Sequence, residues 1–294
     1  MKKFEYKDYP ALYQASDTVS NDTQNTYLLL MKLNIWLLIT AALFSFIGIN
    51  TKAWAIGAAF VFVITIIINV ILMIKNFPDT WYRARSIAES IKTISWRFMM
   101  VTDPFRGLSL EDARDKFLKM QKAILKEQNK DILEKFDPSC HTKDALTKTM
   151  LKIFEDTIEN KINIYRIHRV EEQRDWYSNK TKYNQSKYRF WFSIMILVQI
   201  IAVATVICRV AVPDFEYWPP EVLSVIASGI LTWIQMKKYR ELAAAYSFTA
   251  HEIGILGANI DSIKNEEELS NFVQDAENAF SREHTQWVAR KDNF

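Results

Sequence analysis

The segment SREHTQWVAR, residues 281–290, gathers side chains that are typical of a catalytic site. Arg282, Glu283, His284 and Trp287 fall within two helical turns, where a carboxylate beside an imidazole could exchange protons with a substrate. A helix through this segment divides the group, however, because residues share a face only at spacings of three or four. His284 and Trp287 then lie on the apolar face, Glu283 borders that face, and Arg282 points away from it.

The same helix predicts a structural contact instead of a catalytic one. An inward carboxylate such as Glu283 needs a partner, because an unpaired buried charge costs free energy. Arg83, Arg85 and Arg240 are the candidates, and we favour Arg85. For His284, packing is the preferred role over ligand binding or pH sensing. The predicted structural clasp, which would pin the last helix to the helical bundle, consists of Arg85, Glu283, His284 and Trp287.

Motifs of known enzymes are otherwise incomplete. His251 and Glu252 begin a zinc-protease HExxH motif, but Ile255 occupies the position of the second ligand. The four histidines and two cysteines show no metal-ligand spacing, and six glycines cannot supply a phosphate-binding loop. We therefore predict no catalytic residues, no metal site and no cofactor. An intramembrane enzyme with unfamiliar chemistry is kept as a minor alternative.

A polar face in an apolar segment offers a second kind of chemistry. Five polar residues recur at spacings of three and four, which places them on one side of a helix. Polar groups in lipid are costly, so this face must contact water or another helix. One interpretation is close helix packing through Ala227 and Gly229. The other is the wall of a pore built by several copies, with an acidic ring at its outer mouth that would favour cations. The predicted pore-lining residues are Glu221, Ser224, Ser228, Thr232 and Gln235.

A third candidate site is the segment DWYSNKTKYNQSKYRFW, residues 175–191, which alternates cations with aromatic rings. Such a segment can lie at the membrane interface and contact anionic lipid headgroups. It can also bind a nucleotide, with cations on the phosphates and rings stacked on the bases. The predicted nucleotide-binding residues are Lys180, Lys182, Tyr183 and Lys187.

The elements that position these residues are membrane-spanning helices. Of the 294 residues, 49% are hydrophobic, and they concentrate in four blocks. The blocks are Thr26–Ile49, Trp54–Ile74, Phe190–Val212 and Val222–Met236. About 20 apolar residues cross the hydrocarbon layer, so three blocks have sufficient length, and Tyr217 and Trp218 could extend the short fourth one. The predicted fold is an all-α membrane protein, with four transmembrane helices as two hairpins and a long-helix cytoplasmic bundle.

The distribution of lysine and arginine predicts the orientation. These residues flank the hairpins on the side of the termini and of the middle segment, whereas the short turns contain only Lys52, with Arg209 near the end of the third span. Both termini and the long middle segment of this multi-pass membrane protein are therefore expected in the cytoplasm. The predicted parts are a cytoplasmic N-terminal segment (1–25), a first transmembrane hairpin (26–74), a cytoplasmic helical region (75–189), a second transmembrane hairpin (190–236) and C-terminal cytoplasmic helices (237–294).

Three segments carry a resemblance to a known family. They are WYRARSIAESIKTISWRF after the first hairpin, QRDWYSNKTKYN before the second, and SREHTQWVAR near the end. The chain resembles the SLATT proteins, bacterial two-transmembrane effectors associated with nucleotide-signal defence, as two such units in tandem. A Tyr-Arg pair followed by small residues, in WYRARSIAES and in KKYRELAAAY, also indicates duplication. The tandem arrangement is similar to Hailong-type membrane effectors, which an oligodeoxyadenylate made by a nucleotidyltransferase restrains.

The resemblance implies a membrane effector of anti-phage defence that lies in the bacterial inner membrane. We expect an oligomeric pore or ion channel, gated by a nucleotide signal, that depolarises the membrane and causes abortive infection. The expected partners are further copies of the chain (a tetramer is one such homo-oligomer), a nucleotide or oligonucleotide, a neighbouring nucleotidyltransferase and anionic lipids. A membrane scaffold that recruits a toxic partner is the alternative from another class.

Overall fold

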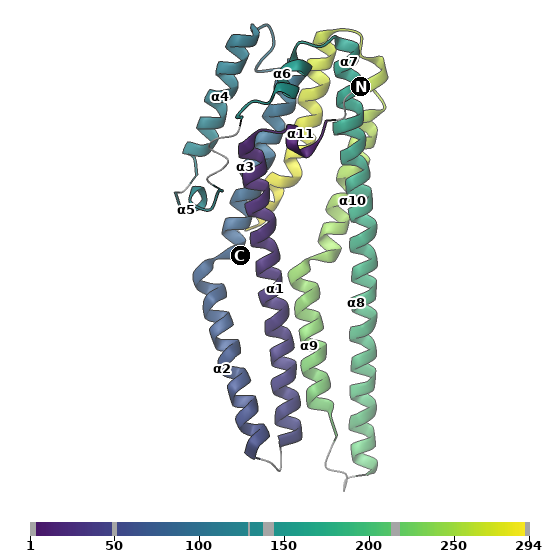
Figure 1. The fold of residues 1–294 in the computed structure, drawn as a ribbon. Helices are drawn as coiled ribbons and strands as arrows, with labels where there is room; N and C mark the ends of the chain where they lie inside the picture. The colour runs from purple at the N-terminus through teal and green to yellow at the C-terminus, as the bar shows by residue number, and fades with distance from the viewer. Residues whose placement is uncertain (1–3, 49–51, 129, 138–143, 213–217, 292–294) are drawn as a thin grey trace. The chain divides into compact units, whose positions relative to one another are not determined.

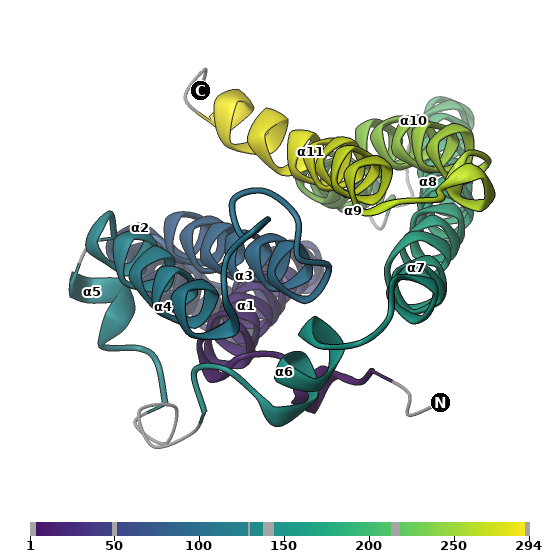
Figure 2. The same cartoon turned by 90° about the horizontal axis from the view of Figure 1, so that it is seen from above.

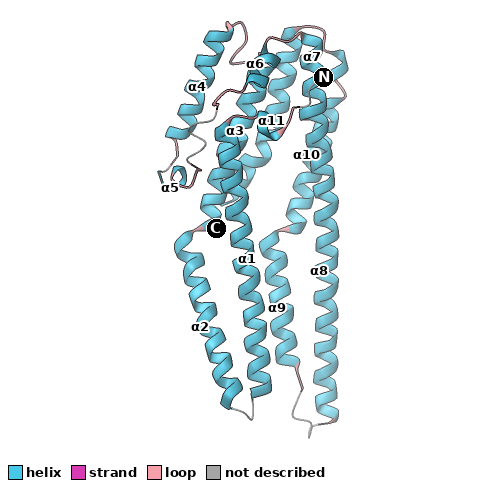
Figure 3. Cartoon of the chain, in the orientation of Figure 1, coloured by secondary structure: helices cyan, strands magenta, loops and turns pink. Residues whose placement is uncertain are grey.

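The chain is helical along nearly its whole length, as Figure 3 shows. The computed structural model describes residues 4–48, 52–128, 130–137, 144–212 and 218–291, without the side chains of 130, 131 and 282–291. No strand occurs in these ranges. No glycine occurs between Gly107 and Gly229 and no proline between Pro138 and Pro213, so little interrupts the helical hydrogen bonds in this part of the chain. The all-α prediction is confirmed.

The long helices follow the apolar blocks of the sequence (Figure 1). The two hairpins and their continuations are α1 (Ala11–Ile47), α2 (Lys52–Lys75), α3 (Phe77–Met99), α8 (Glu172–Ala211), α9 (Pro220–Lys237) and α10 (Tyr239–Gly257). Between and after them come α4 (Leu110–Lys126), α5 (Lys130–Leu133), α6 (Lys148–Phe154), α7 (Ile158–Tyr165), the π-helical stretch η4 (Arg166–Glu171) and α11 (Glu266–Lys291). Ser109 caps α4 by accepting a hydrogen bond from the Asp112 amide at 3.1 Å, as is typical of an N-cap serine.

Three helical stretches are long and apolar enough to cross a membrane. They are Ala11–Ile47, Lys52–Met99 and Ile158–Ala211, and their apolar portions coincide with the first three predicted spans. The polar remainder of each stretch, which includes α3 and η4, lies outside those spans. α9 has 18 residues and is not among the three stretches, so the fourth span stays a prediction.

The chain divides into two compact units. The first unit comprises Met1–Gln24, Pro78–Lys180 and Ala245–Phe294. Its core centres on α3, where Ile87, Ile91, Trp96 and Phe98 are buried completely. α10 lies beside α8 in both views (Figure 1 and Figure 2), and their contact includes two tyrosine rings, Tyr177 and Tyr246, with centroids 5.6 Å apart.

The second unit comprises Asn25–Phe77 and Thr181–Ala244 and holds the apolar parts of α1, α2, α8 and α9. The Asn34 amide of α1 donates to Oδ1 of Asn69 on α2 at 3.0 Å, an interhelical bond that joins the two helices of this apolar hairpin. α9 approaches α1 closely at Gly229, where an added Cβ would lie only 2.9 Å from Ile35 Cγ2. Large apolar side chains remain exposed on this unit, for example Ile56 at 70% and Val210 at 80%. Such a surface suits contact with lipid chains.

Both hairpins end in the same backbone feature. Asn76 follows α2 with φ 39° and Lys238 follows α9 with φ 47°, so a single left-handed residue separates each helix from the next. In each case a lysine precedes this residue, and an aromatic residue begins the following helix. This break is a clearer mark of duplication than the Tyr-Arg pairs. Aligning the breaks pairs Phe77 with Tyr239, five residues away from an alignment on the two Tyr-Arg pairs.

Candidate functional site

The five polar residues predicted to line a pore lie together on α9, and all five are exposed. The opposite side of the helix is buried through Val222, Ala227 and Ile234, and the close approach at Gly229 is also away from the polar stripe. The small residues therefore pack α9 within the unit, while the described residues leave the polar stripe exposed. Close packing and the polar stripe thus lie on different faces of one helix, and pore lining by the stripe stays a prediction.

Within the stripe, the helix itself satisfies part of the hydrogen-bonding capacity. Ser224 Oγ donates to the Pro220 carbonyl and Thr232 Oγ1 donates to the Ser228 carbonyl, each at 2.9 Å. Glu221, in the first turn of α9, lies 3.4 Å from Arg209 Nη1 on α8. The hydroxyl oxygens can still accept hydrogen bonds from outside. The stripe can therefore contact water or the polar face of another helix.

The predicted nucleotide-binding residues all lie on α8 but not on one face. Lys180, Tyr183 and Lys187 follow one another at spacings of three and four, whereas Lys182 is two residues from Lys180 and points elsewhere. Lys180 Nζ lies 5.4 Å from the Trp176 ring centroid, and Lys187 Nζ lies 5.6 Å from that of Tyr183. These cation–π contacts form an aromatic-cationic stripe. Its ligand, nucleotide or lipid, stays a prediction.

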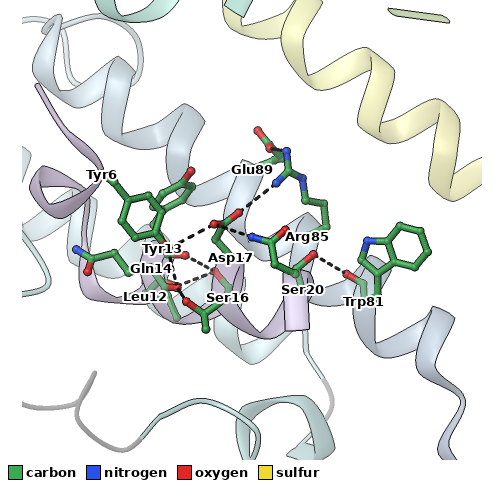
Figure 4. Close-up of polar contacts among 12 residues, drawn as sticks. Tyr6, Leu12, Tyr13, Gln14, Ser16, Asp17, Ser20, Trp81, Arg85 and Glu89 are labelled. Atoms are coloured by element: carbon green, nitrogen blue, oxygen red, sulfur yellow. Dashed lines mark hydrogen bonds and ion pairs between the residues drawn. The ribbon is translucent and has the colours of Figure 1, made fainter. Parts of the chain in front are cut away.

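Arg85, a member of the predicted clasp, belongs to a polar network between α1 and α3 (Figure 4). Its guanidinium lies 3.1 Å from Asp17 Oδ1 and 2.5 Å from Glu89 Oε1. Burial lowers the pKa of Arg85, but Glu89 and Asp17 more than offset this effect and raise it. The predicted contact with Glu283, His284 and Trp287 lies outside the described side chains, although their helix, α11, is described.

The described part of α11 does hold an inward carboxylate that pairs with an arginine, at Glu277. Glu277 and Arg169 of η4 are 0% and 1% exposed, and two hydrogen bonds of 2.8 and 2.6 Å join them. Tyr165 and Thr93 donate to the same carboxylate at 3.0 and 2.9 Å. Burial lowers the pKa of Arg169, but Glu277 raises it above its ordinary value. Sequence reasoning missed this pair, although Glu277 falls on the apolar face between Val273 and Phe280.

Lys92 on α3 lies near this pair. Burial, together with the positive charge of Arg169, lowers the pKa of the Lys92 ammonium to about 8. Glu89 and Glu172 oppose the shift without cancelling it. The first unit thus carries the fully buried Arg169 on η4 and two partly exposed cations, Arg85 and Lys92, on α3. Among the described residues, no cluster of three or more potential metal ligands occurs.

These features define an all-helical protein with helices that can cross a membrane. Its first unit holds the buried ion pair between Arg169 of η4 and Glu277 of α11. Residues 10–162 match the family model of SMODS and SLOG-associating 2TM effector domain 3, and residues 165–287 match effector domain 1. The chain belongs to this SLATT family and carries two of its domains in tandem. No curated protein and no solved structure matches the chain.

The two family domains share one core in the first unit. Thr93 and Trp96 of the first domain contact Glu277 and Tyr165 of the second, the latter pair with ring centroids 5.6 Å apart. Arg97 also donates to Asn278 Oδ1 at 3.0 Å. The tandem is therefore a pair of interlocked repeats. Membership of the family makes a membrane effector the coarse functional class.

Proposed function

We propose that the chain is an oligomeric pore-forming effector of the bacterial inner membrane, gated by a nucleotide signal, which depolarises the cell and causes abortive infection. One observation carries the proposal: five polar residues of α9 are exposed on a helix whose other face packs against its own unit. Several copies around an axis would place these stripes toward a shared aqueous path. In this proposal α9 is the fourth membrane span.

Gating requires two arrangements of the protein that differ in affinity for the signal. The aromatic-cationic stripe of α8 supports a nucleotide as the ligand, because rings and cations suit bases and phosphates. An oligodeoxyadenylate that holds the pore closed, made by a neighbouring nucleotidyltransferase, is the form of signal that we propose. Replacing Lys180, Lys182 and Lys187 together by glutamine should abolish the response to the nucleotide and leave membrane insertion intact. Loss of insertion would assign the stripe to lipid binding.

Expression in cells that carry a voltage-sensitive dye tests the pore. The wild-type chain should collapse the membrane potential without any neighbouring gene, because the chain itself conducts. A scaffold that recruits a toxic partner would be harmless when expressed alone. An intramembrane enzyme would change the lipid composition before the potential falls, which lipid extraction and mass spectrometry would detect.

A further inference from the structure

Arg209 is the only charged residue between Phe190 and Val212, and it lies beside the polar stripe of α9. Its Nη1 is 3.4 Å from Oε1 of Glu221, and the two side chains are 58% and 71% exposed. The surrounding surface of α8 is apolar, with Ile207 at 64% and Val210 at 80% exposed. The guanidinium therefore occupies the same end of the stripe as the carboxylate.

Each of the two charges lies at a helix end that stabilises it independently of the other. Arg209 is in the last turn of α8, where carbonyl groups carry partial negative charge, and Glu221 is in the first turn of α9, where amide groups carry partial positive charge. Removal of one member therefore leaves the other charged and in place. Because both side chains are exposed, they act on mobile ions more than on the stability of the fold.

We infer that Arg209 sets the ion selectivity of the pore by cancelling the charge of Glu221 at its mouth. This inference rests on the proposed function. A ring built from Glu221 alone would carry one negative charge per copy and would favour cations, whereas Arg209 returns that ring to zero net charge. The wild-type pore therefore passes cations and anions with little discrimination, which suits rapid depolarisation.

Reversal potentials in planar bilayers under a tenfold KCl gradient test this assignment. The wild type should reverse near zero. Arg209→Gln should shift the reversal toward the potassium equilibrium potential, with a several-fold higher permeability ratio of cation to anion. Glu221→Gln should shift it toward the chloride equilibrium potential, and the double variant should return it near zero.

Lys52→Gln is the matched control, because it removes a cation from the start of α2, in the other hairpin, and should leave the reversal potential unchanged. An Arg209→Gln pore that conducts with an unchanged reversal potential overturns the role of Arg209 and leaves the pore standing. A wild-type chain that passes no current contradicts the proposed pore itself. A Lys52→Gln shift as large as that of Arg209→Gln would likewise overturn the inference, since the effect would not be local to the α9 mouth.

Discussion

The two hairpins use their polar residues in different ways. In the first hairpin, Asn34 of α1 and Asn69 of α2 bond to each other across the helix pair. In the second, α9 keeps a stripe of five polar residues exposed from Glu221 to Gln235. Both hairpins belong to domains of one family, so membership of the family does not account for the difference. In the proposed pore, the first hairpin is the lipid-facing support and the second is the conducting part.

The largest expected effect is a loss of depolarising activity from a substitution in α9 that the same kind of substitution in α2 does not cause. Ser228→Leu should abolish depolarisation, because it places a bulky apolar group in the middle of the stripe. Asn69→Leu makes the same kind of change in α2 and should cost only about 1 kcal/mol through the lost bond to Asn34. Dye-based measurement of membrane potential, at matched levels of inserted protein, checks both variants. Equal losses of activity would remove the distinction between the hairpins.

A second prediction concerns the core that the two repeats share. Glu277→Gln should lower the free energy of unfolding by about 3–5 kcal/mol, because it leaves the Arg169 guanidinium buried without its charged partner. The double variant Arg169→Met/Glu277→Leu should recover most of this loss, since no charge remains buried. Thermal unfolding in detergent, followed by tryptophan fluorescence, measures the three proteins. If the single variant unfolds like the wild type, the pair does not hold the repeats together.

A third prediction concerns the pH dependence of stability. It rests on Lys92 of the first family domain, whose pKa is lowered by burial and by the charge of Arg169 in the second domain. Its pKa in the folded protein is about 8, below the ordinary value of 10.5. Below pH 8 both folded and unfolded states hold the proton, and the full cost of the buried charge is present. From pH 8 to about 10 the unfolded state binds more protons, so stability should rise by about 1–3 kcal/mol.

Lys92→Met should remove this rise and should be more stable than the wild type at pH 7. Burial raises the pKa values of Tyr9 and Tyr165. Above pH 10 these two residues should lower the stability of the folded protein as pH rises, because the folded state keeps their protons longer than the unfolded state does. Melting temperatures at half-unit pH steps give the comparison. A wild type whose stability is flat between pH 8 and 10 would contradict the assignment.

The smallest expected effect on stability comes from substitutions at the left-handed residues that follow the two hairpins. Lys238→Gly should stabilise the protein by up to about 1 kcal/mol, because glycine adopts positive φ without the steric cost of a Cβ. Asn76→Gly should gain less, since asparagine tolerates this conformation better than lysine. Lys237→Gly is the matched control within α9 and should destabilise by about 1 kcal/mol. If Lys237→Gly and Lys238→Gly change the free energy of unfolding in the same direction, the effect of Lys238→Gly does not come from its left-handed backbone conformation.

Local patterns explain what the sequence could predict. Apolar runs and scarce breakers indicate the helices, and the 3.6-residue period by itself places Ser224, Ser228 and Thr232 on one face of α9. The partners of Arg169 and Arg209, and the contact of Arg85 with Asp17, could not be predicted in this way, because ion pairs between helices depend on how those helices pack. Glu277 did carry a signal, since a carboxylate on an apolar helical face must find a buried cation.

Single-channel recording with a chemical probe tests most directly whether the α9 stripe lines a conducting path. Ser228→Cys, in a chain whose native Cys140 and Cys208 are replaced by alanine, would be placed in planar bilayers and exposed to a bulky, water-soluble thiol reagent. We predict current steps that fall on addition of the reagent, whereas Ile66→Cys on the exposed apolar face of α2 should conduct without change. A protein that is electrically silent with every nucleotide tried, or a pore that the reagent blocks at Ile66→Cys and not at Ser228→Cys, would contradict this account.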